Sequence, residues 1–123
     1  MSVPNENTNP IGWLSGIYTV MSNVLAAMSG VYAPLTSVTL TNVASSASNV
    51  TLIAANANLR LLTVFNDSTA ILYLKYGATA STTSYTVRIA AGGYFEMPQP
   101  IYTGVIDGIW ASANGSARIT AGV

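Results

Sequence analysis

Residues 37–43 read Ser-Val-Thr-Leu-Thr-Asn-Val, and in this stretch the spacing of the apolar residues changes. Before it, apolar residues recur at intervals of three and four, as on one face of a helix. From here on they alternate with polar residues and β-branched side chains are frequent, as in strands with one buried face. The sequence therefore predicts an N-terminal arm and helix over residues 1–35 and a β domain over residues 36–123.

The second part of the chain consists of short apolar segments separated by turn residues. Seven or eight such strands are typical of an antiparallel β-sandwich or a jelly-roll-like domain. Asn66-Asp67-Ser68 is expected to be a turn, with Asp67 as an Asx-turn residue, and Gly92-Gly93 and Asn114-Gly115 are expected to close hairpins. The expected strands are 37–43, 49–54, 59–65, 70–76, 85–90, 94–97, 105–111 and 117–120.

One helix is predicted, over residues 11–30. Asn9 suits the N-cap, Pro10 the first helical position and Gly30 the C-terminal stop. Gaps of three and four alternate between its main apolar residues, which is heptad spacing and predicts an oligomer interface. An alternative is that this face packs on the chain's own β domain. The interface residues are Leu14, Ile17, Met21, Val24, Met28 and Val31.

The same segment has two other interpretations. Its length and the Gly12/Gly16 pair suit a membrane span, but Asn23 and several hydroxyl residues interrupt it and no Lys or Arg flanks it. A secretory signal is not favoured either, because no Lys or Arg precedes the apolar run. We therefore expect no membrane partner.

The composition favours an assembly. Of the 123 residues, 50% are hydrophobic and only 7% are charged, and residues 7–59 contain no charged residue. A surface with so few charges is poorly soluble as a monomer, so we expect much of it to be buried between subunits. Four acidic and four basic residues balance, which gives no attraction to nucleic acid.

The residue types offer little chemistry. There is no Cys and no His, which removes the commonest general base and metal ligand. The few charges are scattered, and the simplest interpretation pairs Arg88 with Glu96 across the Gly92-Gly93 turn. We expect no enzyme activity, no catalytic residues, no cofactor and no metal site.

The aromatic residues of the β domain fit two roles. They are expected mainly in the core or in an interface, but an exposed set suits a carbohydrate or peptide surface. The candidate surface-contact aromatics are Tyr94, Tyr102 and Trp110.

The second part also contains a recognisable series of motifs over residues 56–121. In order, they are Leu61-Leu62-Thr63-Val64-Phe65-Asn66-Asp67-Ser68, Ile71-Leu72-Tyr73-Leu74, Tyr85-Thr86-Val87-Arg88-Ile89, Gly93-Tyr94-Phe95-Glu96-Met97-Pro98, Tyr102-Thr103-Gly104 and Ile109-Trp110-Ala111. The series resembles a module of small structural proteins of tailed bacteriophages, of the capsid cement, decoration or head-fibre type. The resemblance does not include the helix.

The resemblance implies a function and partners. It implies a β-rich homotrimer at threefold positions of an icosahedral shell, where it binds the major capsid protein and clamps neighbouring capsomers. The protein would then be assembled in the host cytoplasm and lie on the capsid surface of the virion. Two alternatives stay open: a phage tail, baseplate or fibre component, and a carbohydrate- or receptor-binding β module.

Overall fold

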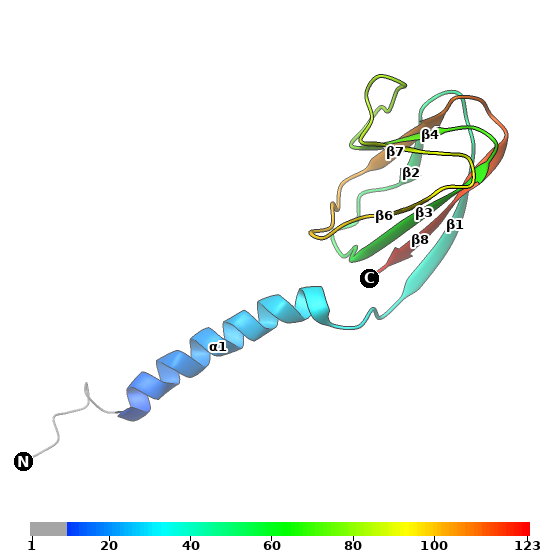
Figure 1. The fold of residues 1–123 in the computed structure, drawn as a ribbon. Helices are drawn as coiled ribbons and strands as arrows, with labels where there is room; N and C mark the ends of the chain where they lie inside the picture. The colour runs from blue at the N-terminus through cyan, green and yellow to red at the C-terminus, as the bar shows by residue number, and fades with distance from the viewer. Residues whose placement is uncertain (1–9) are drawn as a thin grey trace, which may run out of the picture. The chain divides into compact units, whose positions relative to one another are not determined.

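The structure is a computed structural model that describes residues 10–123, with the side chains of residues 10, 11 and 29–32 excepted (Figure 1). The chain divides into two compact units, Met1–Pro34 and Leu35–Val123. The predicted boundary lay one residue later, after residue 35. The predicted N-cap Asn9 and the arm before it lie outside the described residues.

The first unit contains α1 (Pro10–Tyr32), a single helix of 23 residues. It begins at Pro10, as predicted, because proline has no N–H to lose in a first helical turn. The prediction that Gly30 stops the helix is wrong, since α1 continues for two more residues. Pro34 explains the actual end, because a proline disfavours helical backbone in the residue before it.

The second unit is mainly β, with two antiparallel four-stranded sheets, which confirms the predicted fold class (Figure 1). In the first, called the β1 sheet, the strand order is β1-β8-β3-β6; in the second, called the β2 sheet, it is β2-β7-β4-β5. The strands are β1 (Val38–Ala44), β2 (Val50–Ile53), β3 (Leu61–Ser68), β4 (Leu72–Tyr76), β5 (Val87–Ile89), β6 (Tyr94–Glu96), β7 (Ile106–Trp110) and β8 (Gly115–Gly122).

The path of the chain distinguishes between the two predicted architectures. All connections but one lead from one sheet to the other, and only β4 and β5 are consecutive strands that pair directly. First and last strands pair side by side, as do β2 and β7. This nesting of two Greek keys is the jelly-roll arrangement.

Both predicted hairpins are therefore wrong. The Gly92-Gly93 turn joins β5 to β6 and the Asn114-Gly115 turn joins β7 to β8, and each of these connections changes sheet. Arg88 and Glu96 consequently lie in different sheets, so their predicted pairing across a hairpin is also wrong. Local turn chemistry predicts that the chain reverses, but the packing of two sheets decides where it goes.

The core lies between the two sheets and follows from residue alternation. In β4, Leu72 and Leu74 are fully buried while Tyr73 and Lys75 face outward, as their alternation predicts. The largest fully buried side chain is Trp110 of β7. The buried apolar residues are Leu52, Leu59, Leu62, Val64, Ala70, Leu72, Leu74, Ile89, Met97, Ile106, Trp110, Ala117 and Ile119.

Asn66 is a fully buried polar residue in this core. Its Nδ2 donates to the carbonyl oxygens of Ala70 (2.8 Å), Ile89 (2.9 Å) and Ala90 (3.1 Å). Its Oδ1 accepts from Trp110 Nε1 at 3.1 Å. The predicted turn at residues 66–68 is wrong, because β3 continues through these residues. The Asn66 side chain instead links β3 to the turns that follow β3 and β5, which offsets the cost of burying an amide.

Candidate interaction surface

The most unusual surface of the molecule is that of α1. Its apolar side chains are exposed along the helix, although monomeric soluble proteins rarely expose continuous apolar patches of this kind. Leu14, Ile17, Met21, Val24 and Met28, five of the six predicted interface residues, are exposed. The side chain of the sixth, Val31, lies outside the described residues. These side chains therefore lie on the surface of the helix. That they form an oligomer interface stays a prediction.

The apolar surface is wider than heptad spacing alone predicts. Trp13, Tyr18, Val20 and Leu25 flank the heptad stripe and are also exposed; Trp13 is 68% and Tyr18 74% accessible. The heptad pattern missed them because they occupy the positions beside the stripe. A helical-wheel reading of the same sequence contains the signal, because the small and polar residues gather on the opposite face. These residues are Ser15, Thr19, Ser22 and Ala26.

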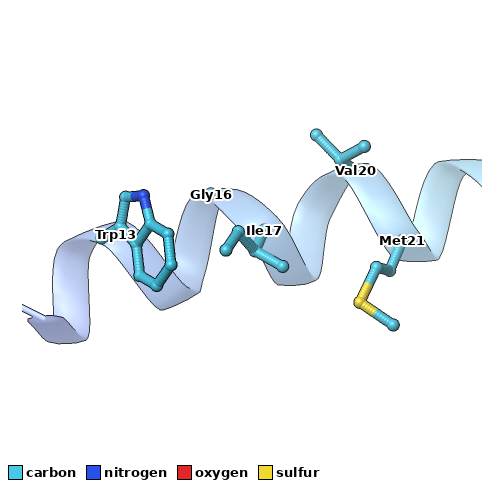
Figure 2. A pocket seen from close by; sticks show the side chains of 5 residues that line it. All are labelled: Trp13, Gly16, Ile17, Val20 and Met21. Atoms are coloured by element: carbon cyan, nitrogen blue, oxygen red, sulfur yellow. The ribbon is translucent and has the colours of Figure 1, made fainter.

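A shallow open hollow of about 460 Å³ lies on one flank of the helix (Figure 2). Trp13, Ile17 and Val20 form its walls, Gly16 leaves its floor without a side chain, and Met21 borders it. A methyl group added at Gly16 would have no neighbour within 4 Å. The hollow is thus a dent in an apolar helix surface, and its lining residues have no acid, base or metal-binding group.

A second apolar surface lies on the outer face of the β1 sheet. Val38 and Leu40 of the edge strand β1 are exposed there, Leu40 to 78%. Across the sheet, Phe65 of β3 lies directly opposite Tyr94 of β6, and Tyr94 is 61% exposed. Strand β1 contains neither a charged residue nor a proline, the devices that usually protect a sheet edge.

The outer face of the β2 sheet is different, because the segment between β4 and β5 folds over it. Asp107 of β7 is nearly buried there and accepts hydrogen bonds from Thr79 N (2.7 Å) and Asn49 Nδ2 (2.9 Å). Lys75 Nζ donates to the Thr79 carbonyl oxygen at 3.2 Å. These bonds hold Thr79 in the left-handed region, at φ 63°, which a β-branched residue rarely adopts.

The charge state of Asp107 follows from these partners. Burial would raise its pKa, but the Thr79 N–H, the Asn49 and Thr51 side chains and the nearby Lys75 charge favour the carboxylate. Together they hold the pKa below its ordinary value. Asp107 Oδ2 thus fastens the segment between β4 and β5 to β7, while Asp107 Oδ1 is buried without a hydrogen-bond partner among the described residues.

A further small depression, of about 290 Å³, is lined by Asp67, Ser68, Thr69, Asn114 and Gly115. Its polar groups are already engaged: Asp67 Oδ2 accepts from Arg118 Nε at 2.8 Å, and Asn114 Oδ1 accepts from Thr69 N at 3.1 Å. Asp67 is therefore an ion-pair residue of β3, and its predicted role in an Asx-turn is wrong.

The three candidate surface aromatics occupy different environments. Tyr94 is exposed on the outer face of the β1 sheet. Tyr102 is half-buried and stacks on Tyr76, with ring centroids 5.3 Å apart. Trp110 is only 1% exposed, so its assignment to the chain surface is wrong. The strand pattern did not reveal this because Trp110 faces inward beside Asn66, a partner distant in the sequence.

Residues 10–123 contain no group of three or more Asp or Glu residues placed to hold a metal ion. Within the same part of the chain, no helix combines the length and hydropathy needed to cross a membrane. Comparison of the chain with models of protein families, with curated proteins and with solved structures finds no match in any of the three.

Proposed function

We propose that this protein is a structural subunit of a phage particle, a capsid cement or decoration protein that acts as a homotrimer. The observation that carries the proposal is the exposed, charge-free apolar surface of α1, joined to a sandwich domain that buries its own core. Such a surface needs protein partners, and a repetitive shell supplies many identical ones. The jelly-roll arrangement is compatible, but viral capsid, lectin and cupin domains share it, so it does not select the function.

The proposed mechanism is linkage between binding and assembly. A subunit that binds only the assembled lattice of the major capsid protein favours that lattice by mass action. The outer face of the β1 sheet is the surface that we assign to capsid contact, because Val38 and Leu40 leave an apolar strand edge open there. No catalytic group, cofactor or metal takes part in this mechanism.

The test uses phage heads that normally carry the protein, after the protein has been removed from them. Added back, the purified protein is expected to bind at threefold positions, visible by electron microscopy, and to raise the temperature at which the heads break. Leu40→Ser is expected to weaken this binding, whereas Thr51→Ser, on the exposed surface of the other sheet, leaves it unchanged. Failure of the unmodified protein to bind such heads would contradict the proposal, and its location on tails or fibres would support a tail or baseplate role.

A receptor- or carbohydrate-binding module is the second candidate. The exposed Tyr94, opposite Phe65, favours it, because sugars stack on aromatic faces at accessible surfaces. Glycan-array binding that is lost in Tyr94→Ala but kept in Tyr18→Ala would support this candidate over the cement role.

A further inference from the structure

We propose that α1 forms a parallel, in-register bundle with the same helix of at least two other copies of this chain. The inference rests on the proposed homo-oligomeric function and names the occupant of the apolar helix surface. The helix supplies three heptads with no charged residue in its whole length of 23 residues. In proteins most of the stability of a helix comes from the packing of its apolar face, so the stability of α1 depends on what that face packs against.

The heptad positions distinguish two strands from more. The spacing places Leu14, Met21 and Met28 at the a positions, and Ile17 and Val24 at d positions. Two-stranded parallel coiled coils prefer β-branched residues at a and leucine at d, whereas the reverse distribution shifts the preference to three or four strands. Within the a/d stripe of α1, the β-branched residues Ile17 and Val24 stand at d and none stands at these a positions. The side-chain shapes therefore indicate a bundle of more than two helices.

The flanks of the stripe lead to the same conclusion. The e and g positions of a two-stranded coiled coil lie at the edge of the interface and commonly carry Glu and Lys. Here they carry Trp13 and Val20 on one side and Tyr18 and Leu25 on the other, all exposed in the single chain. A dimer would leave much of this surface in water, whereas in a larger bundle each helix has two neighbours and both flanks are covered.

The hollow on α1 has the geometry of a helix contact (Figure 2). Trp13, Gly16, Ile17 and Val20 are spaced i, i+3, i+4 and i+7, the four residues that form the hole for one side chain of a facing helix. Gly16 deepens the hole because it has no side chain. The hollow lies on the d–g flank, where a second neighbouring helix would pack.

The remaining face indicates which side stays in solvent. Ser15, Thr19 and Ser22 gather opposite the apolar surface, and the Thr19 hydroxyl donates to the Ser15 carbonyl oxygen at 3.0 Å. A closed ring of three equivalent copies requires their helices to run in one direction. A membrane surface is a poor alternative occupant, because interfacial helices carry Lys or Arg on the polar face and this one carries neither.

The absence of cysteine from the chain makes the direction and register testable in the full-length protein. Leu14→Cys and Met21→Cys place a thiol in the centre of the bundle, and Thr19→Cys is the matched control on the outer face. Under oxidation we expect each central variant to form disulfides between identical chains and the control to form few. Light scattering is expected to give a mass of three or more chains.

A mixing experiment separates the two directions. In an antiparallel pair Leu14 would lie near Met28, so disulfides between Leu14→Cys chains and Met28→Cys chains would overturn the parallel arrangement. A monomeric or dimeric mass, or equal cross-linking at Thr19 and Met21, would also overturn the inference. Leu25→Glu is expected to break the oligomer while the β domain keeps its unfolding midpoint, and Thr19→Glu, on the outer face, to leave the mass unchanged.

Failure of the bundle and failure of the capsid role are distinguishable. A three-chain protein with parallel cross-links that does not bind stripped heads keeps the bundle and contradicts the cement function. A monomer or dimer that binds the heads keeps the capsid role but overturns both the bundle and the homotrimer.

Discussion

The two tryptophans of this protein lie in the two units of the chain and have opposite environments. Trp110 of the sandwich is 1% exposed and donates its indole N–H to Asn66. Trp13 of α1 is among the most exposed large side chains and borders a dent in the helix surface. The difference teaches that the β domain builds a buried core within one chain, whereas the helix of the other unit exposes most of its large apolar side chains.

The largest expected effect is on the stability of the sandwich. Trp110→Ala removes the largest buried side chain and should lower the free energy of unfolding by about 3–5 kcal/mol. Trp13→Ala should change it by no more than about 0.5 kcal/mol, since the residue is exposed and belongs to the other unit of the chain. Urea unfolding followed by the far-ultraviolet β signal measures both. Equal losses in the two variants would contradict the division of the chain into a self-sufficient domain and a dependent helix.

Asparagine gives a second matched pair. Asn66→Ala leaves the indole N–H of Trp110 without its acceptor and takes the amide donor from the carbonyl oxygens of Ala70, Ile89 and Ala90, which together should cost roughly 3 kcal/mol. The loss is limited because Ala70 O still accepts from Ser68 Oγ and Ala90 O from Gly93 N. Asn23→Ala, on the exposed surface of α1, removes no buried hydrogen bond and should leave the unfolding midpoint of the sandwich unchanged. Thermal melts of the two variants make the measurement. If Asn66→Ala has the same melting temperature as the unmodified protein, the hydrogen bonds of the Asn66 amide do not stabilise the core.

The smallest expected effect on stability concerns two aspartates on the outer faces of the sheets. Asp107 is buried on the β2 sheet, and Asp67 is exposed on the β1 sheet. Because the folded pKa of Asp107 is lowered, its carboxylate stabilises the fold above about pH 4, the unfolded value, and loses this contribution as the pH falls through the folded value. Asp107→Asn should cost roughly 1–2 kcal/mol at neutral pH and flatten the acid limb of the stability curve.

Asp67→Asn is the control for that experiment. It breaks an ion pair whose side chains are 46% and 64% exposed, so its effect should stay below about 1 kcal/mol. The measurement is the free energy of unfolding at a series of pH values between 2 and about 7. Parallel curves for Asp107→Asn and the unmodified protein would show that the loop does not depend on the charge of Asp107.

The sequence predicted the parts that depend on local order. Alternation located the eight strands to within a few residues, and heptad spacing located α1 and its stripe, because a two-residue or three-to-four-residue period is written directly in the chain. The turn signals at Gly92-Gly93 and Asn114-Gly115 were real, since the chain does reverse there. Their interpretation as hairpins failed, because a turn does not specify whether the next strand joins the same sheet or the opposite one.

The sequence by itself determined two features of the candidate interaction surface: the apolar stripe of α1 and the scarcity of charged residues. Both depend only on residue type and spacing. Only the tertiary structure decided that Trp110 is in the core and that Asp67 pairs with Arg118. It also decided that Asn66 and Asp107 are buried and accept hydrogen bonds from distant segments of the chain. Each of these depends on a partner 28 to 58 residues away in the chain. Burial at such separations is decided by the packing of two sheets, which no local period encodes.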